Sequence, residues 1–243
     1  MSRRFISLAF CVLFVPTAAA ETVRLATLDW PPYTGGKLPA FGATSEIITQ
    51  AFAKMETKTE IVVRPWKRAI AEAQNGRAAG YFPGYHCRHV EGFIASDPVG
   101  TGPLGFAEHA ERPIQWRSID DLGEQKLKIG TVLGYVNTDE FDRKVGSGWI
   151  RAITAKDDLT NLKKLARKRI DAAVIDKFVL AYMLAVESSL KPYADKIKFN
   201  AKPLEEKRLH LCVTSEPLRD AFNAALKKVD IDQILTDYFK RDF

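Results

Sequence analysis

The segment GRAAGYFPGYHCRHVEGFIASDP, residues 76–98, carries the strongest local signals in the sequence. It opens on a glycine that ends a helical pattern, continues through an aromatic run, and closes on a Ser-Asp-Pro turn. His86, Cys87, Arg88 and His89 follow without apolar periodicity, so we predict a short strand that leads into an irregular loop. An arginine among aromatic side chains suits a small carboxylate, which a guanidinium binds through two parallel hydrogen bonds. The alternative is a solvated surface arginine.

Upstream of this segment, strand and helix patterns alternate. Residues 23–27 and 59–63 have the composition of strands. Residues 42–55 carry apolar side chains at helical spacing, and residues 66–75 follow a proline that suits the first position of a helix. The Trp-Pro-Pro-Tyr turn at residues 30–33 is expected to present two aromatic side chains. The order strand, helix, strand, helix, strand predicts an α/β unit with a parallel sheet.

Downstream, a strand at residues 102–108 and a polar stretch precede a second unit of the same kind. Its predicted strands are residues 127–132, 149–154 and 171–175, and its predicted helices start near Thr138, Asp157 and Asp176. Strands at residues 197–201 and 208–213 and two amphipathic helices end the chain. We therefore expect a two-lobed α/β fold whose hinge consists of two crossover segments. The expected division is lobe 1 at residues 21–110, lobe 2 at 111–195, and a return to lobe 1 at 196–243.

The first twenty residues have the features of a signal peptide, with a basic start, an apolar centre and an Ala-Ala-Ala cleavage site. Cleavage after Ala20 would remove Arg3 and Arg4, and the net charge would fall from +6 to +4. We therefore expect a periplasmic protein. Basic and acidic residues interleave along the chain, which argues against nucleic-acid binding. Cys87 and Cys212 would remain, and in an oxidising compartment they could form a disulfide or stay free.

The order of these pieces resembles the family 3 extracellular solute-binding proteins, the periplasmic receptors of ABC importers for polar amino acids and related solutes. The chain would belong to a divergent branch of that family. The resemblance covers nearly all of the chain after the signal peptide, and it rests on short motifs in a specific order: Trp30-Pro31-Pro32-Tyr33, Gly42 with Glu46, Gly76, Arg88, Ser96-Asp97-Pro98, Ile119-Asp120-Asp121-Leu122, Gly134, and Arg169-Ile170-Asp171-Ala172-Ala173 with Asp176.

The resemblance implies a set of ligand-binding residues. Arg88 would bind the carboxylate of the solute, and Trp30 or Tyr33 would stack on its body. Asn137 would supply an amide, and Asp176 would bind an α-ammonium group. Two further candidates, Arg68 and Phe82, lie in aromatic and basic motifs that depart from the common family pattern. The structural alternatives are a wall position for Trp30, an ion pair for Arg88 and a helix N-cap for Asp176.

These features predict a receptor that closes on a small polar solute, works as a monomer, needs no cofactor or metal, and delivers the solute to an ABC permease. Three other functions compete with this one. An enzyme of the same fold could use His86 and His89, or Asp176 with His109, as acid and base. A metal site could use His86, Cys87 and His89. A sensor could pass the binding signal to a signalling partner instead of a permease.

Overall fold

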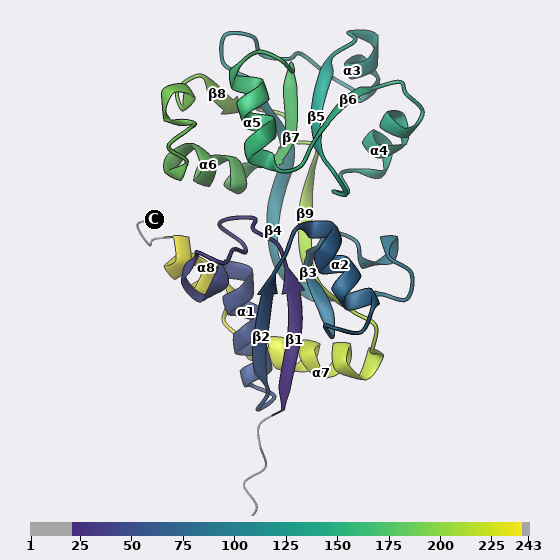
Figure 1. The fold of residues 1–243 in the computed structure, drawn as a ribbon, viewed down its shortest axis with the longest axis vertical. Coiled ribbons are helices and arrows are strands. Elements are labelled where there is room, and N and C mark those ends of the chain that lie inside the picture. Colours follow the sequence, from purple (N-terminus) through teal and green to yellow (C-terminus); the bar gives the residue numbers. More distant parts are fainter. Residues whose placement is uncertain (1–20, 240–243) are drawn as a thin grey trace, which may run out of the picture.

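The computed structural model describes residues 21–239, so the predicted signal peptide and its cleavage site lie outside the described residues. The chain folds into two lobes stacked along the long axis of the molecule (Figure 1). Within residues 21–239, no helix has both the length and the apolar character needed to cross a membrane.

Lobe 1 holds both ends of the described chain (Figure 1). Two of its helices, α7 and α8, come from the end of the sequence and return to pack against α1. The elements are β1 (Thr22–Thr27), α1 (Ala43–Ala53), β2 (Lys58–Val63), α2 (Trp66–Gln74), β3 (Gly80–Gly84), α7 (Glu216–Leu226) and α8 (Ile231–Phe239).

Lobe 2 repeats the alternation of strands and helices. Its parallel strands are flanked by helices whose caps are visible in the sequence: Thr138, Asp157 and Asp176 each accept a hydrogen bond from a backbone N–H of the first turn. The elements are α3 (Asp120–Glu124), β5 (Lys128–Val132), α4 (Asp139–Gly146), β6 (Arg151–Ala155), α5 (Asp158–Ala166), β7 (Ala172–Asp176), α6 (Lys177–Val186) and β8 (Ile197–Phe199).

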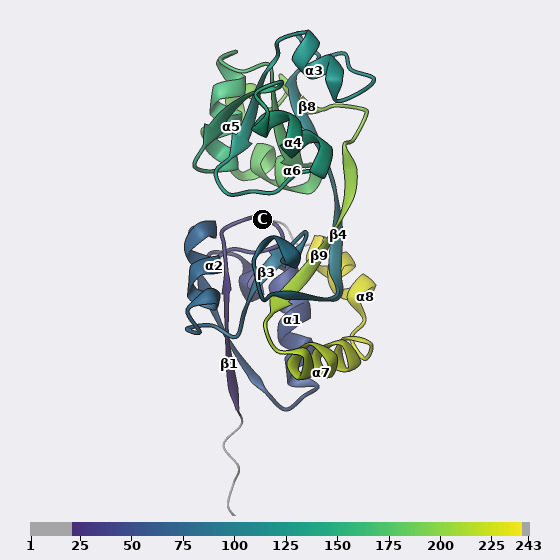
Figure 2. The same cartoon turned by 90° about the vertical axis from the view of Figure 1, so that its right-hand side faces the viewer.

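Two long strands, β4 (Ile94–His109) and β9 (Glu205–Val213), pass from one lobe to the other and form the hinge (Figure 2). They pair with each other in antiparallel register from Ile94 opposite Val213 to Leu104 opposite Glu205. The strand order is β2-β1-β3-β9-β4-β7-β5-β6, with β8 beside β4. The expected two crossover segments are therefore confirmed, and they are strands.

The strand pairing bears on where each lobe begins. The expected division placed residues 196–243 in lobe 1, yet β8 pairs with the part of β4 that also pairs with β7. We propose that lobe 2 consists of residues 104–205 and lobe 1 of the remaining described residues, because the crossings then coincide with the end of the β4–β9 ladder.

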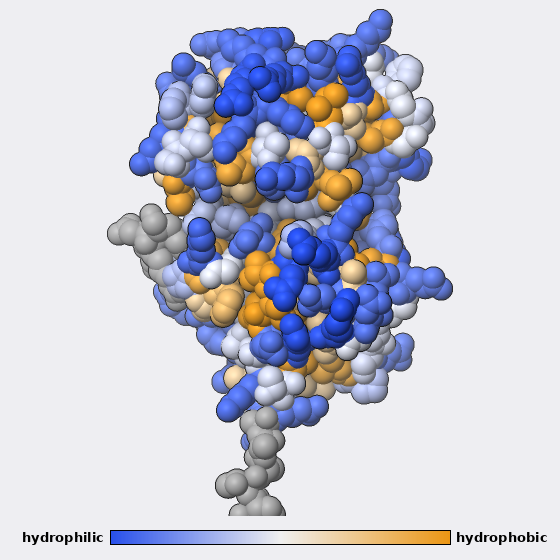
Figure 3. Space-filling model, in the orientation of Figure 1, coloured by the Kyte–Doolittle hydropathy of each residue, from blue (hydrophilic) through white to orange (hydrophobic). Residues whose placement is uncertain are grey.

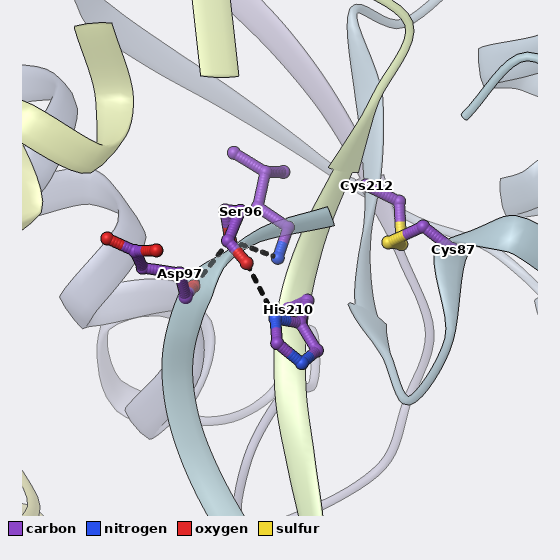
Figure 4. Close-up of a disulfide and its surroundings, with 6 residues drawn as sticks. Cys87, Ser96, Asp97, His210 and Cys212 are labelled. Atoms are coloured by element: carbon purple, nitrogen blue, oxygen red, sulfur yellow. Dashed lines mark hydrogen bonds between the residues drawn. A yellow bond between two sulfur atoms is a disulfide. The ribbon is translucent and has the colours of Figure 1, made fainter. Parts of the chain in front are cut away.

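The Ser-Asp-Pro motif at residues 96–98 was expected to form a turn, and that prediction is wrong. These residues lie inside β4, at a bulge where the register with β9 shifts. The Ser96 hydroxyl accepts a hydrogen bond from the Leu211 N–H at 3.0 Å, and the Ser96 carbonyl lies 2.7 Å from the His210 ring (Figure 4). A bulge also tolerates Pro98, which has no N–H to give to the ladder.

A buried disulfide joins Cys87 to Cys212 (Figure 4). Cys87 begins the short 3-10 helix η2 (Cys87–His89), and Cys212 lies on β9. The bond therefore settles the alternative that the sequence left open. It fixes the loop that contains Arg88 and the two neighbouring histidines to a strand of the hinge.

Candidate functional site

A pocket of about 270 Å³ lies between the two lobes. The space-filling view shows a recess at this level with hydrophobic side chains on both of its sides (Figure 3). Most lining side chains are aromatic or aliphatic, with Lys67, His86 and His89 as the polar exceptions. The complete lining is Leu28, Trp30, Trp66, Lys67, Ile70, Tyr81, Pro83, Gly84, Tyr85, His86, His89, Val90, Gly134, Tyr135 and Val136. We call this space the interlobe pocket.

The topology explains why these residues meet. The carboxyl ends of β1, β3 and β5 face the gap between the lobes, where ligands of open α/β sheets bind. Trp30 follows β1, Tyr85 follows β3, and Tyr135 follows β5. Gly134 has a positive φ of 84°, which turns the chain sharply after β5 and brings its loop against Lys67 of α2.

Two buried carboxylates of lobe 2 lie behind the aromatic wall. Asp158 accepts hydrogen bonds from the Trp30 indole and the Tyr135 hydroxyl. Burial, with the nearby charge of Asp157, raises the pKa of Asp158 to about 7. Because Trp30 belongs to lobe 1, this contact connects the lobes.

The second carboxylate, Asp176, makes a similar connection. It accepts hydrogen bonds from the N–H groups of Phe178 at 2.8 Å and Val179 at 3.1 Å, so it is the N-cap of α6. The Tyr33 hydroxyl of lobe 1 lies 3.3 Å from both of its oxygens. Burial raises the pKa of Asp176 to about 7, although the hydrogen bonds oppose the shift.

Comparison with solved structures places this architecture among known folds. No protein-family model and no curated protein matches the chain. The GluR0 ligand-binding core from Nostoc punctiforme, in complex with L-glutamate, superposes with a TM-score of 0.71 at 18% identity, covering 89% of this chain and 97% of that one. An ancestral arginine-binding protein bound to arginine gives 0.71 at 19%, with 90% and 98% covered. The chain has the fold of the two-lobed periplasmic binding proteins.

A third structure with this fold is an amino acid-binding ancestor of an enzyme. AncCDT-1, described as an ancestral amino acid-binding protein and a precursor of cyclohexadienyl dehydratase, gives a TM-score of 0.70 at 20% identity, covering 90% of this chain and 95% of that one. The predicted resemblance to family 3 receptors is thus confirmed at the level of the fold.

Three of the predicted site residues contact one another at the boundary between the lobes, and of these three Trp30 alone lines the interlobe pocket. Trp30 lines the interlobe pocket and stacks on Tyr33, with 4.7 Å between the ring centroids. Tyr33 in turn reaches Asp176. In this structure Asp176 is occupied by the protein's own groups, as an N-cap and as the partner of Tyr33.

The other four predicted residues do not line the interlobe pocket. Arg68 is exposed on α2, one position beyond Lys67, and Phe82 is buried in the core of lobe 1. Asn137 donates a side-chain hydrogen bond to Asp142 at 2.7 Å. Arg88, with 71% of its side chain exposed, lies 3.6 Å from Asp139 of lobe 2.

Sequence reasoning missed Lys67, Tyr85, Tyr135 and Asp158. Lys67 had only an ambiguous signal, because Arg68 beside it is also a cation, and only the phase of α2, on which Trp66 and Ile70 line the pocket, selects between them. Asp158 had none, because an acidic residue directly after an N-cap is normally a solvated helix start.

The structure brings together some of the residues considered for an enzyme or a metal site and separates others. His109 is five positions along β4 from Leu104, the residue opposite Asp176, and at the rise of a strand this separates them by about 17 Å. The proposed pairing of Asp176 with His109 therefore does not form. Cys87 is in a disulfide and is not available as a metal ligand. His86 and His89 do come together, with 5.5 Å between their rings.

We expect Gly102→Ala to separate Tyr33 from Asp176. Gly102 lies in β4 at the hinge, and a Cβ at this position would overlap both the Asp176 carboxylate and the Tyr33 hydroxyl. Overlap of this kind costs about 1–3 kcal/mol, which urea unfolding would measure. Gly146→Ala is the matched control, because a Cβ there meets no atom. Equal unfolding free energies in the two variants would contradict the prediction.

Proposed function

We propose that the protein is a periplasmic solute receptor whose interlobe pocket binds a small carboxylate-bearing solute with an aromatic or aliphatic body. The single observation that supports this most directly is the composition of the interlobe pocket. Its walls are aromatic and aliphatic side chains from both lobes, and concave apolar sites with few polar groups are typical of small-molecule binding. A solute that contacts both walls would favour the closed arrangement of the lobes.

The charges around the pocket favour an anionic group over an ammonium group. Among the described lining residues, Lys67 is the side chain with a permanent charge, and it is positive. The carboxylates Asp158 and Asp176 lie behind the wall and bind Trp30 and Tyr33. A solute ammonium would have to displace these aromatic donors. This arrangement favours a simple organic acid over an α-amino acid.

We further propose that the loaded receptor delivers its solute to an ABC importer. The support is the two-lobed fold with a two-strand hinge, through which binding would change the shape of the molecule, together with the predicted signal peptide. Delivery to a membrane permease requires a receptor that is itself exported, so the proposed location is the periplasm.

Substitution of the adjacent residues Lys67 and Arg68 tests whether the pocket binds a carboxylate through Lys67. We expect a thermal-shift screen of aromatic and aliphatic carboxylates, amino acids, amines and sugars to identify a carboxylate as ligand. Calorimetry should then show that Lys67→Met weakens its binding by tenfold or more, about the worth of one charge-assisted hydrogen bond. Arg68→Met is the matched control on the same helix, and we expect unchanged affinity.

The variant Arg88→Ala distinguishes carboxylate binding by Lys67, as proposed here, from carboxylate binding by Arg88, as the family resemblance implies. Unchanged affinity in Arg88→Ala with a loss in Lys67→Met would support the pocket-lining lysine. Loss of affinity only in Arg88→Ala would refute the role of Lys67 and favour the arginine, and a screen in which amines or sugars alone bind would refute the carboxylate.

A further inference from the structure

His86 and His89 line the interlobe pocket, and Asp139 lies close to both of them. One ligand atom from each of the three side chains lies within 4.8 Å of the others. The two histidines come from the loop around η2 in lobe 1, and the aspartate is the first residue of α4 in lobe 2. From this geometry we propose that the three side chains bind one divalent metal ion such as Zn²⁺, Ni²⁺ or Cu²⁺, and that this ion bridges the two lobes.

The donor set fits this class of ion. Two imidazole nitrogens and one carboxylate oxygen suit Zn²⁺, Ni²⁺ or Cu²⁺, whereas Ca²⁺ and Mg²⁺ prefer oxygen ligands throughout. Ligand atoms of a tetrahedral zinc ion lie about 3.4 Å apart, given bond lengths near 2 Å. The exposed His89 and Asp139 side chains can close the remaining gap by rotation. Three protein ligands leave a fourth position for water or a solute oxygen.

The protein holds the two histidines close to their required places. Cys87 lies between them in the sequence, and its disulfide to Cys212 anchors the loop to β9. Lys207 and Arg88 also lie near His86.

The two cations near the cluster, Lys207 and Arg88, do not prevent a metal ion from binding. Lys207 is 2.8 Å from Glu205, which offsets its charge. Arg88 is the present partner of Asp139, but with 71% of its side chain exposed it can turn into solvent when a metal ion arrives. Arg88 is therefore a competitor for Asp139, and its removal should strengthen metal binding or leave it unchanged.

Because two ligands belong to one lobe and the third to the other, the ion would bind the closed arrangement better than an open one. By linkage, closure on a solute and binding of the ion would then reinforce each other. The metal site itself does not depend on the proposed solute, so the two proposals can fail separately.

Zinc titration of the chelator-treated, untagged protein in the absence of solute tests the site. We expect calorimetry to show one Zn²⁺ per chain and no binding of Ca²⁺. His89→Gln and Asp139→Asn should each weaken zinc binding by tenfold or more, whereas His210→Gln and Glu140→Gln, which alter a histidine and a carboxylate outside the cluster, should not. Circular dichroism would verify that all four variants fold.

Two outcomes would overturn the proposal. One is the absence of stoichiometric zinc binding by the unmutated protein. The other is zinc affinity in Asp139→Asn equal to that in Glu140→Gln, since a metal held by lobe 1 alone would not bridge the lobes. Solute titration in the presence of chelator measures the pocket independently of either result.

Discussion

Replacement of both Cys87 and Cys212 by serine should lower the free energy of unfolding by about 2–5 kcal/mol. The two cysteines are separated by 125 positions in the sequence, and a cross-link over a loop of this length restricts the unfolded chain strongly. Both sulfur atoms are buried among Tyr81, Phe93 and their neighbours. The double variant therefore also places two hydroxyl groups in an apolar cluster, which adds to the loss.

Urea unfolding of the oxidised protein and the double variant measures this difference. The unmutated protein unfolded in the presence of a reductant serves as the control, because it loses the cross-link without gaining the serines. Peptide mapping of the denatured, unreduced protein should find Cys87 joined to Cys212. Recovery of both as free thiols would contradict the structure at this point.

Asp158→Asn should stabilise the protein at pH 8 and have little effect at pH 4. The pKa of Asp158 is raised from 3.8 to about 7 in the folded state, so the folded protein binds the proton more tightly than the unfolded chain does. The carboxyl group is therefore tolerated best below pH 4, and its cost grows as the pH rises from about 4 to 7. A shift of this size is worth on the order of 4 kcal/mol per carboxyl.

The amide of asparagine removes the buried charge and keeps one oxygen that accepts hydrogen bonds. We expect a gain of roughly 2–4 kcal/mol at pH 8, measured by urea unfolding at the two pH values. Asp195→Asn, which removes an exposed carboxylate, controls for the change in net charge. A gain of the same size at pH 4 would show that the charge of Asp158 is not the cause.

Much of the fold could be predicted from the sequence, because each lobe alternates strands and helices and the helix ends carry clear capping and turn residues. Asp157 precedes an apolar helical stripe and caps α5, and Gly76 follows α2, as the sequence predicts. The hinge was harder. One of its two strands, β4, contains proline and glycine residues that signal turns locally, and the long ladder with β9 makes that segment extended.

The lining of the interlobe pocket was harder to predict than the fold, because its residues come from segments far apart in the chain. Trp30 was visible as an aromatic residue at a strand end, and it does line the pocket. Arg88 was expected to bind a carboxylate because it precedes the Ser-Asp-Pro motif, but in the structure it lies 3.6 Å from Asp139. Which of two adjacent cations, Lys67 or Arg68, faces the cleft depends on the exact phase of α2, and sequence patterns fix helix boundaries only to within one or two residues.

With lobe 2 at residues 104–205, as proposed above, the β4–β9 ladder would allow the lobe to be exchanged as one piece. Leu104 lies opposite Glu205, and Pro103 lies opposite Glu206, so both ends of the inserted segment leave from facing positions. A two-residue hairpin turn spans such positions. A chimera that exchanges residues 104–205 for the equivalent piece of another protein with this fold would keep the β2-β1-β3-β9-β4 sheet and the disulfide, because Cys87 and Cys212 both lie outside the exchanged segment.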